Sequence, residues 1–159
     1  MRRIALFPGS FDPFTDGHEA LVRRALAIFD QIIIAVGVNS DKQYMFSVDE
    51  RVDMIEKRFA DDSQIKVVSY SDMTVDCCRR EGAGFILRGV RDTKDFEYEQ
   101  TVAAVNRNLA PEIDTVLLLS DLEYKDISST VERERLRHST HTLTHSSIHL
   151  GPLNRHIIS

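Results

Sequence analysis

The chain has 159 residues, of which 42% are hydrophobic and 28% charged, a size and composition typical of one globular domain with a sizeable core. Its formal net charge of −5 argues against a broad nucleic-acid-binding surface, so local basic groups must hold any anionic ligand. No apolar run approaches the roughly 18–20 residues that a membrane-spanning helix needs, and the first residues lead into a strand pattern instead of a signal sequence. We therefore expect a cytoplasmic protein that binds neither membranes nor nucleic acids.

Short β-branched apolar runs alternate with longer helical patterns along the chain, which predicts repeated βα units around a parallel sheet. The predicted strands, all expected to be buried, are Arg3–Phe7, Gln31–Val38, Ile65–Ser69, Phe85–Arg88 and Asp114–Leu119. The predicted helices are Gly17–Phe29, one that begins at a capping box formed by Ser47 and Glu50, Asp72–Glu81, Thr93–Leu109, and one from Ser129 to about His138. This order predicts an α/β fold with a doubly wound, five-stranded, Rossmann-like parallel sheet.

No repeat, linker or low-complexity segment divides the chain, so we expect a single domain over residues 1–159 with an atypical C-terminal tail at 131–159. The tail is rich in His, Ser, Thr and Arg, and we expect it to be irregular after the last helix or ordered only by oligomer contacts. His141 and His145 share the i,i+4 spacing of a zinc site, but no nearby Cys or carboxylate completes one. We therefore predict no bound metal site.

Two adjacent cysteines, Cys77 and Cys78, lie in a predicted helix. Their side chains point in different directions around a helix, and adjacent cysteines do not form the C-x-x-C pattern of many metal sites. We predict two free thiols with a role in the core.

The segment FPGSFDPFTDGH, residues 7–18, lies where the first predicted strand hands over to a helix. Ligands of parallel sheets bind at such places, beyond the carboxyl ends of the strands. Gly9 lets the backbone approach a ligand closely, and a helix N-terminus at Gly17 and His18 favours an anion. Composition alone leaves two interpretations open: an ordinary loop in which His18 caps a helix, or a phosphate-binding turn.

Two motifs more than a hundred residues apart favour the second interpretation. Residues 15–18 read T-D-G-H and match a T/H-x-G-H pattern, while Ile127–Thr130 with Arg133 match I-S-S-T-x-x-R. Together they resemble the nucleotidylyltransferase superfamily, whose members transfer a nucleotidyl group from a triphosphate and release pyrophosphate. The resemblance implies a nucleotidylyltransferase fold and a His18 that stabilises the transition state.

Further segments resemble the phosphopantetheine adenylyltransferase family, bacterial enzymes that make dephospho-coenzyme A from ATP and 4′-phosphopantetheine. The likeness runs from about Arg3 to Arg133, and the segments that carry it are PGSFDPFTDGH, KQYMFSVDERVDMI, ILRGVRDTKDFEYE and YKDISST. It implies a homohexamer and a Mg²⁺ ion that arrives with ATP. Two rival functions stay open: a nucleotidylyltransferase acting on nicotinate mononucleotide or an alcohol phosphate, and a nucleotide-binding regulator without turnover.

The same resemblance implies two overlapping sets of site residues. Those implied to bind ATP are Ser10, Phe11, His18, Gly89, Val90, Arg91, Glu99, Tyr124, Lys125, Asp126, Ile127, Ser128, Ser129 and Thr130. Those implied to bind phosphopantetheine are Ser10, Lys42, Thr74 and Arg88. Ser10 stands where the family usually has Thr, and the hydroxyl is kept.

The residues themselves support this assignment less sharply. Arg88 and Arg91 follow a predicted strand closely enough to converge on one ligand, but either could instead pair with Asp92, Asp95 or Glu97. Lys42 could be solvated. Glu99 lies in a carboxylate-rich stretch that alone is typical of a solvated helical face.

Overall fold

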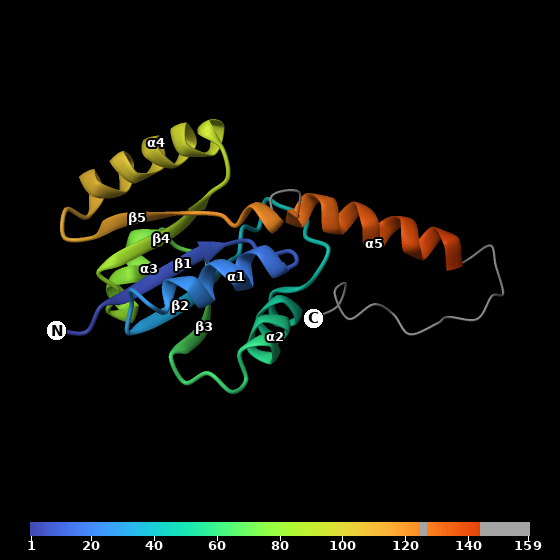
Figure 1. Cartoon of the computed structure of the whole chain (residues 1–159), viewed down its shortest axis with the longest axis horizontal. Helices are drawn as coiled ribbons and strands as arrows, with labels where there is room; N and C mark the ends of the chain where they lie inside the picture. Colours follow the sequence, from blue (N-terminus) through green and yellow to red (C-terminus); the bar gives the residue numbers. More distant parts are fainter. Residues whose placement is uncertain (125–126, 144–159) are drawn as a thin grey trace.

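The structure is a computed structural model that describes residues 1–124 and 127–143. Its elements are β1 (Ile4–Gly9), α1 (Asp16–Ala25), β2 (Gln31–Gly37), α2 (Val48–Arg58), β3 (Ile65–Tyr70), α3 (Thr74–Glu81), β4 (Phe85–Val90), α4 (Thr93–Leu109), β5 (Asp114–Leu119), the short 3₁₀ helix η1 (Leu122–Tyr124) and α5 (Ser129–Leu143). The strands form one five-stranded parallel sheet in the order β3-β2-β1-β4-β5 (Figure 1). The predicted doubly wound α/β fold is confirmed.

Helices cover both faces of the sheet because successive side chains of a strand point to opposite faces. In β2, Ile32, Ile34 and Val36 pack in the same cluster as buried side chains of α1 and α2. Ile33 and Ala35 pack on the other face, with buried side chains of α3. Burial on both faces explains why this strand is apolar without interruption in the sequence.

The prediction that all five strands are buried is wrong for β3 and β5, which are the edges of the sheet. Every residue of both edge strands is either exposed or half-buried, and Leu119 at the end of β5 is 74% exposed. An edge strand has a neighbour on one side only, so the helices that cover the centre of the sheet leave it partly open.

Two helix ends also differ from the prediction. α1 ends at Ala25 instead of Phe29, because the backbone N–H groups of Ala27 and Ile28 donate to carbonyls three residues back and tighten the chain into a turn. α5 continues past His138 to Leu143 and extends away from the sheet (Figure 1).

Two hydroxyl groups in the last turns of α5 are bonded within the helix. Ser139 and Thr140 donate their hydroxyl hydrogens to the carbonyls of Arg135 and Leu136 one turn back. The tail beyond Leu143, including His145, His149 and His156, lies outside the described residues.

Both cysteines are buried and free, as predicted: Cys77 and Cys78 pack in the core on the α3 face of the sheet. Within residues 1–124 and 127–143, none of the helices combines the length and apolar character needed to cross a bilayer.

Candidate active site

Two cavities open at the carboxyl ends of β1 and β4. The larger has a volume of about 930 Å³ and the smaller about 310 Å³. The residues that line both are Pro8, Gly9, Ser10, Arg88 and Glu99. Because one turn and one ion pair border both cavities, ligands in the two would meet at this shared wall.

The turn between β1 and α1 folds tightly around its aromatic residues. Phe11 has a positive φ of 48°, unusual for a bulky residue, and its ring lies 5.2 Å from the ring of Phe7 and 5.1 Å from that of Phe14, centroid to centroid. A Cβ at Gly9 would lie 2.7 Å from the Phe11 ring, so only glycine fits there. Aromatic packing thus holds an unfavourable backbone conformation at Phe11, which lines the smaller cavity.

His18 is fixed in one orientation by the cap of α1. The backbone N–H of Thr15 donates to Nδ1 of His18 at 3.0 Å, and the Thr15 hydroxyl oxygen accepts from the backbone N–H of His18 at 3.3 Å. A backbone N–H can only donate, so Nδ1 must be the acceptor and the ring proton of the neutral imidazole lies on Nε2. His18 lines the smaller cavity, and its Nε2–H remains as a hydrogen-bond donor.

The imidazole is neutral at physiological pH. Burial, followed by the positive charges of Arg58, Arg88 and Arg91, lowers the pKa of His18 to about 3. We expected an anion to bind at this helix N-terminus. The groups there suit an anion: the neutral His18 ring is a hydrogen-bond donor, and three arginines are close enough to affect its pKa.

Arg88 and Glu99 form the ion pair at the shared wall. Nε and Nη2 of Arg88 donate to the Glu99 carboxylate at 3.0 and 2.8 Å, and Nη1 donates to the carbonyl of Pro8 at 2.6 Å. These bonds occupy three of the five N–H donors of the guanidinium, which leaves two for a ligand. Glu99 is only 5% exposed, so its interpretation as part of a solvated helical face is wrong.

The other basic residues separate between the cavities. Lys42 lines the larger cavity, together with Thr74, whose hydroxyl lies 3.2 Å from that of Tyr70. Arg91 lines the smaller cavity. It pairs with Asp95 at 3.2 Å, which was one of the alternatives left open by the sequence, yet its side chain remains 40% exposed.

The structure places most of the predicted site residues around the two cavities. All four residues implied to bind phosphopantetheine line the larger cavity. The residues implied to bind ATP that line the smaller cavity are Ser10, Phe11, His18, Gly89, Arg91, Glu99, Tyr124, Ile127, Ser128 and Ser129. Val90 and Thr130 line neither, and Lys125 and Asp126 lie outside the described residues.

The hydroxyl groups at the start of α5 are partly engaged within the protein. Ser128 caps the helix by accepting from the backbone N–H of Val131, and the Ser129 hydroxyl donates to the carbonyl of Pro13 at 2.8 Å. The Ser129 bond ties α5 to the first turn, and residues of both sequence motifs line the smaller cavity.

Sequence reasoning missed several lining residues. Arg133 borders the smaller cavity and donates to the carbonyl of Asp12, and its place in the second motif was an available signal. Tyr98 and Asn106 of α4 line the larger cavity. Neither had a signal in the sequence, because helical spacing does not show which face of α4 meets a ligand.

Comparisons with known proteins agree with this geometry. Residues 6–135 match the model of the family described as Cytidylyltransferase-like. A phosphopantetheine adenylyltransferase from Phocaeicola vulgatus is 50% identical over 137 residues, covering 86% of this chain and 89% of that relative. Another from Leptospira biflexa is 48% identical over 138 residues, covering 87% and 86%.

Among solved structures, a bifunctional NMN adenylyltransferase/ADP ribose pyrophosphatase from Francisella tularensis has a TM-score of 0.68 at 21% identity. The match covers 87% of this chain, which spans 43% of that protein. At this identity the likeness shows a shared fold alone.

The lowered pKa of His18 predicts a specific pH dependence. In the folded protein without ligands, we expect the imidazole to stay neutral from pH 8 down to at least about pH 5, because its pKa is about 3. Nitrogen chemical shifts of the ring in a ¹⁵N NMR titration would measure this directly. A midpoint near the ordinary histidine value of about 6.5 would contradict it.

The same shift affects stability with a defined sign. Below about pH 6.5, His18 is protonated in the unfolded chain but stays neutral in the folded chain. This residue therefore lowers the free energy of unfolding increasingly as the pH falls towards 3. His18→Gln, which cannot be protonated, should remove that part of the acid destabilisation in urea unfolding curves.

Proposed function

The chain belongs to the phosphopantetheine adenylyltransferase family, as its motifs predicted, and from that premise we propose that it transfers the adenylyl group of ATP to 4′-phosphopantetheine. The products are dephospho-coenzyme A and pyrophosphate, and the reaction takes place in the cytoplasm. The observation that carries the proposal is the pair of cavities that meet at Ser10 and Arg88, because transfer between two phosphorylated molecules requires two adjoining sites.

ATP occupies the smaller cavity in this proposal, where both motifs and Arg91 converge. The phosphopantetheine arm is long and largely uncharged, which suits the larger cavity. Lys42 and Arg88 line this cavity and would bind the phosphate group of the acceptor. Mg²⁺ comes as part of the MgATP substrate and offsets negative charge on the triphosphate. No bound metal site of the protein is needed for this role.

In the transfer step, an oxygen of the acceptor phosphate attacks the α-phosphorus of ATP. The new bond joins that oxygen to the α-phosphorus, the bond from the α-phosphorus to the bridging oxygen of the β-phosphate breaks, and pyrophosphate leaves with the electron pair. The acceptor is already ionised, so no general base is required. The protein contributes position and electrostatics, with Nε2–H of His18 donating to the α-phosphate as its charge rises.

The charges around the shared wall support the assignment of ATP to the smaller cavity and phosphopantetheine to the larger. Glu99 holds the guanidinium of Arg88 in place through two nitrogens, and the free N–H groups then face phosphate. Glu99 is proposed to act in the ATP site through this arginine, because a buried carboxylate would repel a phosphate that it touched directly.

The experiment that tests the proposal measures pyrophosphate release from ATP with different acceptors. 4′-Phosphopantetheine should support turnover at least a hundredfold faster than nicotinate mononucleotide or glycerol 3-phosphate, roughly the discrimination expected of a site built for one acceptor. Faster turnover with either of the other acceptors would favour a rival transferase. ATP binding without turnover on any acceptor would favour the regulator.

The family resemblance also implied a homohexamer, and we propose this assembly here. Large apolar side chains remain exposed in the single chain, and those on α4 are Phe96, Tyr98, Val105 and Leu109. Burial of such side chains favours self-association. We expect light scattering after size-exclusion chromatography to give six times the 18.1 kDa mass of the chain; a monomer at micromolar concentration would contradict this.

Removing the imidazole tests its role in transfer. We expect His18→Ala to lower kcat by about two to three orders of magnitude, the usual cost of losing one transition-state donor, with each KM little changed. His18→Gln, which keeps an N–H donor, serves as the matched variant and should retain more activity. A folded His18→Ala enzyme with near-normal kcat would refute the role.

The two cavities predict opposite effects for two basic residues. Lys42→Ala should raise KM for phosphopantetheine much more than KM for ATP, because Lys42 lines only the larger cavity. Arg91→Ala should do the reverse, because Arg91 lines only the smaller. Steady-state kinetics with each substrate varied in turn would measure both. Equal increases in KM for the two substrates in both variants would contradict the proposed assignment of substrates to cavities.

A further inference from the structure

We propose that Arg51, which lines neither cavity, is a positioning residue that holds the acceptor-side loop and the first turn in fixed register for transfer. The proposal rests on the proposed function for its kinetic consequence, and on structure alone for the contacts. The acceptor-side loop comprises residues 38–46, between β2 and α2, and carries Lys42.

Arg51 lies on α2 and is only 1% exposed. Its Nη1 donates to the carbonyls of Ser10 at 2.7 Å and Gly37 at 3.0 Å, and its Nε donates to the carbonyl of Phe46 at 3.2 Å. One guanidinium therefore joins three separate pieces of backbone: the first turn, the end of β2 and Phe46, which precedes the N-cap of α2.

The acceptor-side loop closes around this guanidinium. The Tyr44 ring covers its face, with 4.0 Å from the guanidinium carbon to the ring centroid. The Tyr44 hydroxyl accepts from the backbone N–H of Asn39 at 2.9 Å, and the Asn39 carbonyl accepts from the N–H of Lys42 at 3.0 Å. The backbone that carries Lys42 is thus organised around Arg51.

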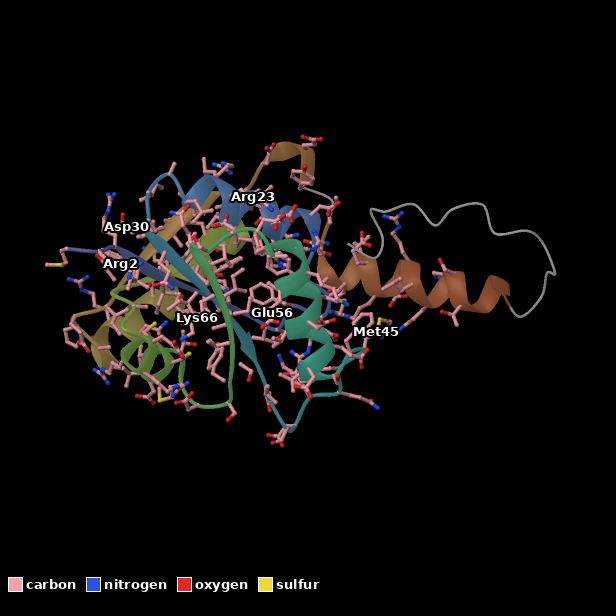
Figure 2. All side chains as sticks on the ribbon, turned by 90° about the horizontal axis from the view of Figure 1, so that it is seen from below. Arg2, Arg23, Asp30, Met45, Glu56 and Lys66 are labelled. Carbon is pink, nitrogen blue, oxygen red and sulfur yellow. The ribbon has the colours of Figure 1, made fainter. Side chains whose placement is uncertain are left out.

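A second contact joins the same two segments. The Asp12 carboxylate, 4% exposed, accepts from the backbone N–H groups of Met45 and Phe46, each at 2.9 Å. Figure 2 shows Met45 beside α2. Phe46 is consequently held through its N–H by Asp12 and through its carbonyl by Arg51, and both holders tie it to the turn at residues 10–12.

Stability alone is a weak reason for a buried arginine here. Among the described residues, no carboxylate oxygen lies within ion-pair distance of Arg51, so carbonyl dipoles and one aromatic ring must offset its desolvation. Even a buried ion pair can often be replaced by apolar residues without loss of stability, so a buried charge is weak evidence for a stabilising role.

The kinetic consequence follows from where the joined segments lie. Ser10 borders both cavities, whereas Lys42 borders only the larger. If the loop shifts relative to the turn, the acceptor phosphate no longer meets the α-phosphate in line, even when both substrates are bound. Displacement of about 1 Å is enough to lower a rate about a hundredfold.

Lysine cannot replace this arginine. An ammonium group carries the same charge, but it lacks the planar fork that reaches several carbonyls and stacks on a tyrosine ring. Arg51→Lys therefore separates the effect of reach from the effect of charge, and Arg51→Met removes both. Ile55→Ala is the matched control: it also alters a fully buried side chain of α2, but Ile55 lines neither cavity and makes none of these contacts.

The test combines hydrogen exchange without substrates and steady-state kinetics on the full chain. In Arg51→Met and Arg51→Lys we expect the amides of Met45 and Phe46 to exchange at least about tenfold faster and kcat at saturating ATP and 4′-phosphopantetheine to fall about 10- to 100-fold. Ile55→Ala should change neither, measured at a temperature where it is folded.

Unchanged exchange and unchanged kcat in folded Arg51→Lys would overturn the proposal, and this variant decides the question if Arg51→Met does not fold. Similar losses in Ile55→Ala would overturn it as well, because the effect would then report general destabilisation. Should the wild-type chain show no transfer, the proposed function fails, while the exchange measurement still tests the contacts of Arg51.

Discussion

The hydrogen bond from the backbone N–H of Thr15 to Nδ1 of His18 decides what the active site can do. It places the ring proton on Nε2, so the imidazole meets the smaller cavity as a neutral donor. Burial and the guanidinium groups of Arg58, Arg88 and Arg91 keep it neutral by lowering its pKa. A reaction that moves a nucleotidyl group to an ionised phosphate needs such a donor and has no use for a general base, so the geometry and the chemistry agree.

Four basic side chains line the two cavities of a chain whose net charge is −5: Lys42, Arg88, Arg91 and Arg133. Carboxylates line the cavities too, but they are engaged within the protein: Glu99 orients Arg88, Asp95 orients Arg91, Asp72 pairs with Arg80, and Asp12 and Asp121 accept from backbone N–H groups. This concentrates attraction for phosphate where the strands end, on a protein whose remaining surface would repel polyanions. The fold supplies the place, because parallel strands bring β1 and β4 side by side with their carboxyl ends together.

Periodicity was sufficient to predict the sheet and its helices. The family resemblance named most of the residues that line the two cavities, and their roles stay predictions. Contacts between distant elements were not predictable in this way. Local composition indicated a solvated helical face at Glu99. This interpretation failed because the partner of Glu99, Arg88, lies on another element, and Glu99 is buried beside it. Arg51 carried a signal in the sequence, because a charged residue on the core-facing side of an amphipathic helix requires partners. The burial of β3 and β5 was overestimated because the order of strands, which makes these two the edges, does not follow from apolar runs.

In the proposed mechanism, acceptor and ATP occupy separate cavities and meet at the Ser10–Arg88 wall under the Nε2–H of His18. A crystal structure of the protein with 4′-phosphopantetheine and a non-hydrolysable ATP analogue tests it most directly. We expect the acceptor phosphate in the larger cavity with an oxygen about 3–3.5 Å from the α-phosphorus, and Nε2 within hydrogen-bond distance of an α-phosphate oxygen. A nucleotide bound in the larger cavity, or an α-phosphate beyond the reach of His18, would contradict it.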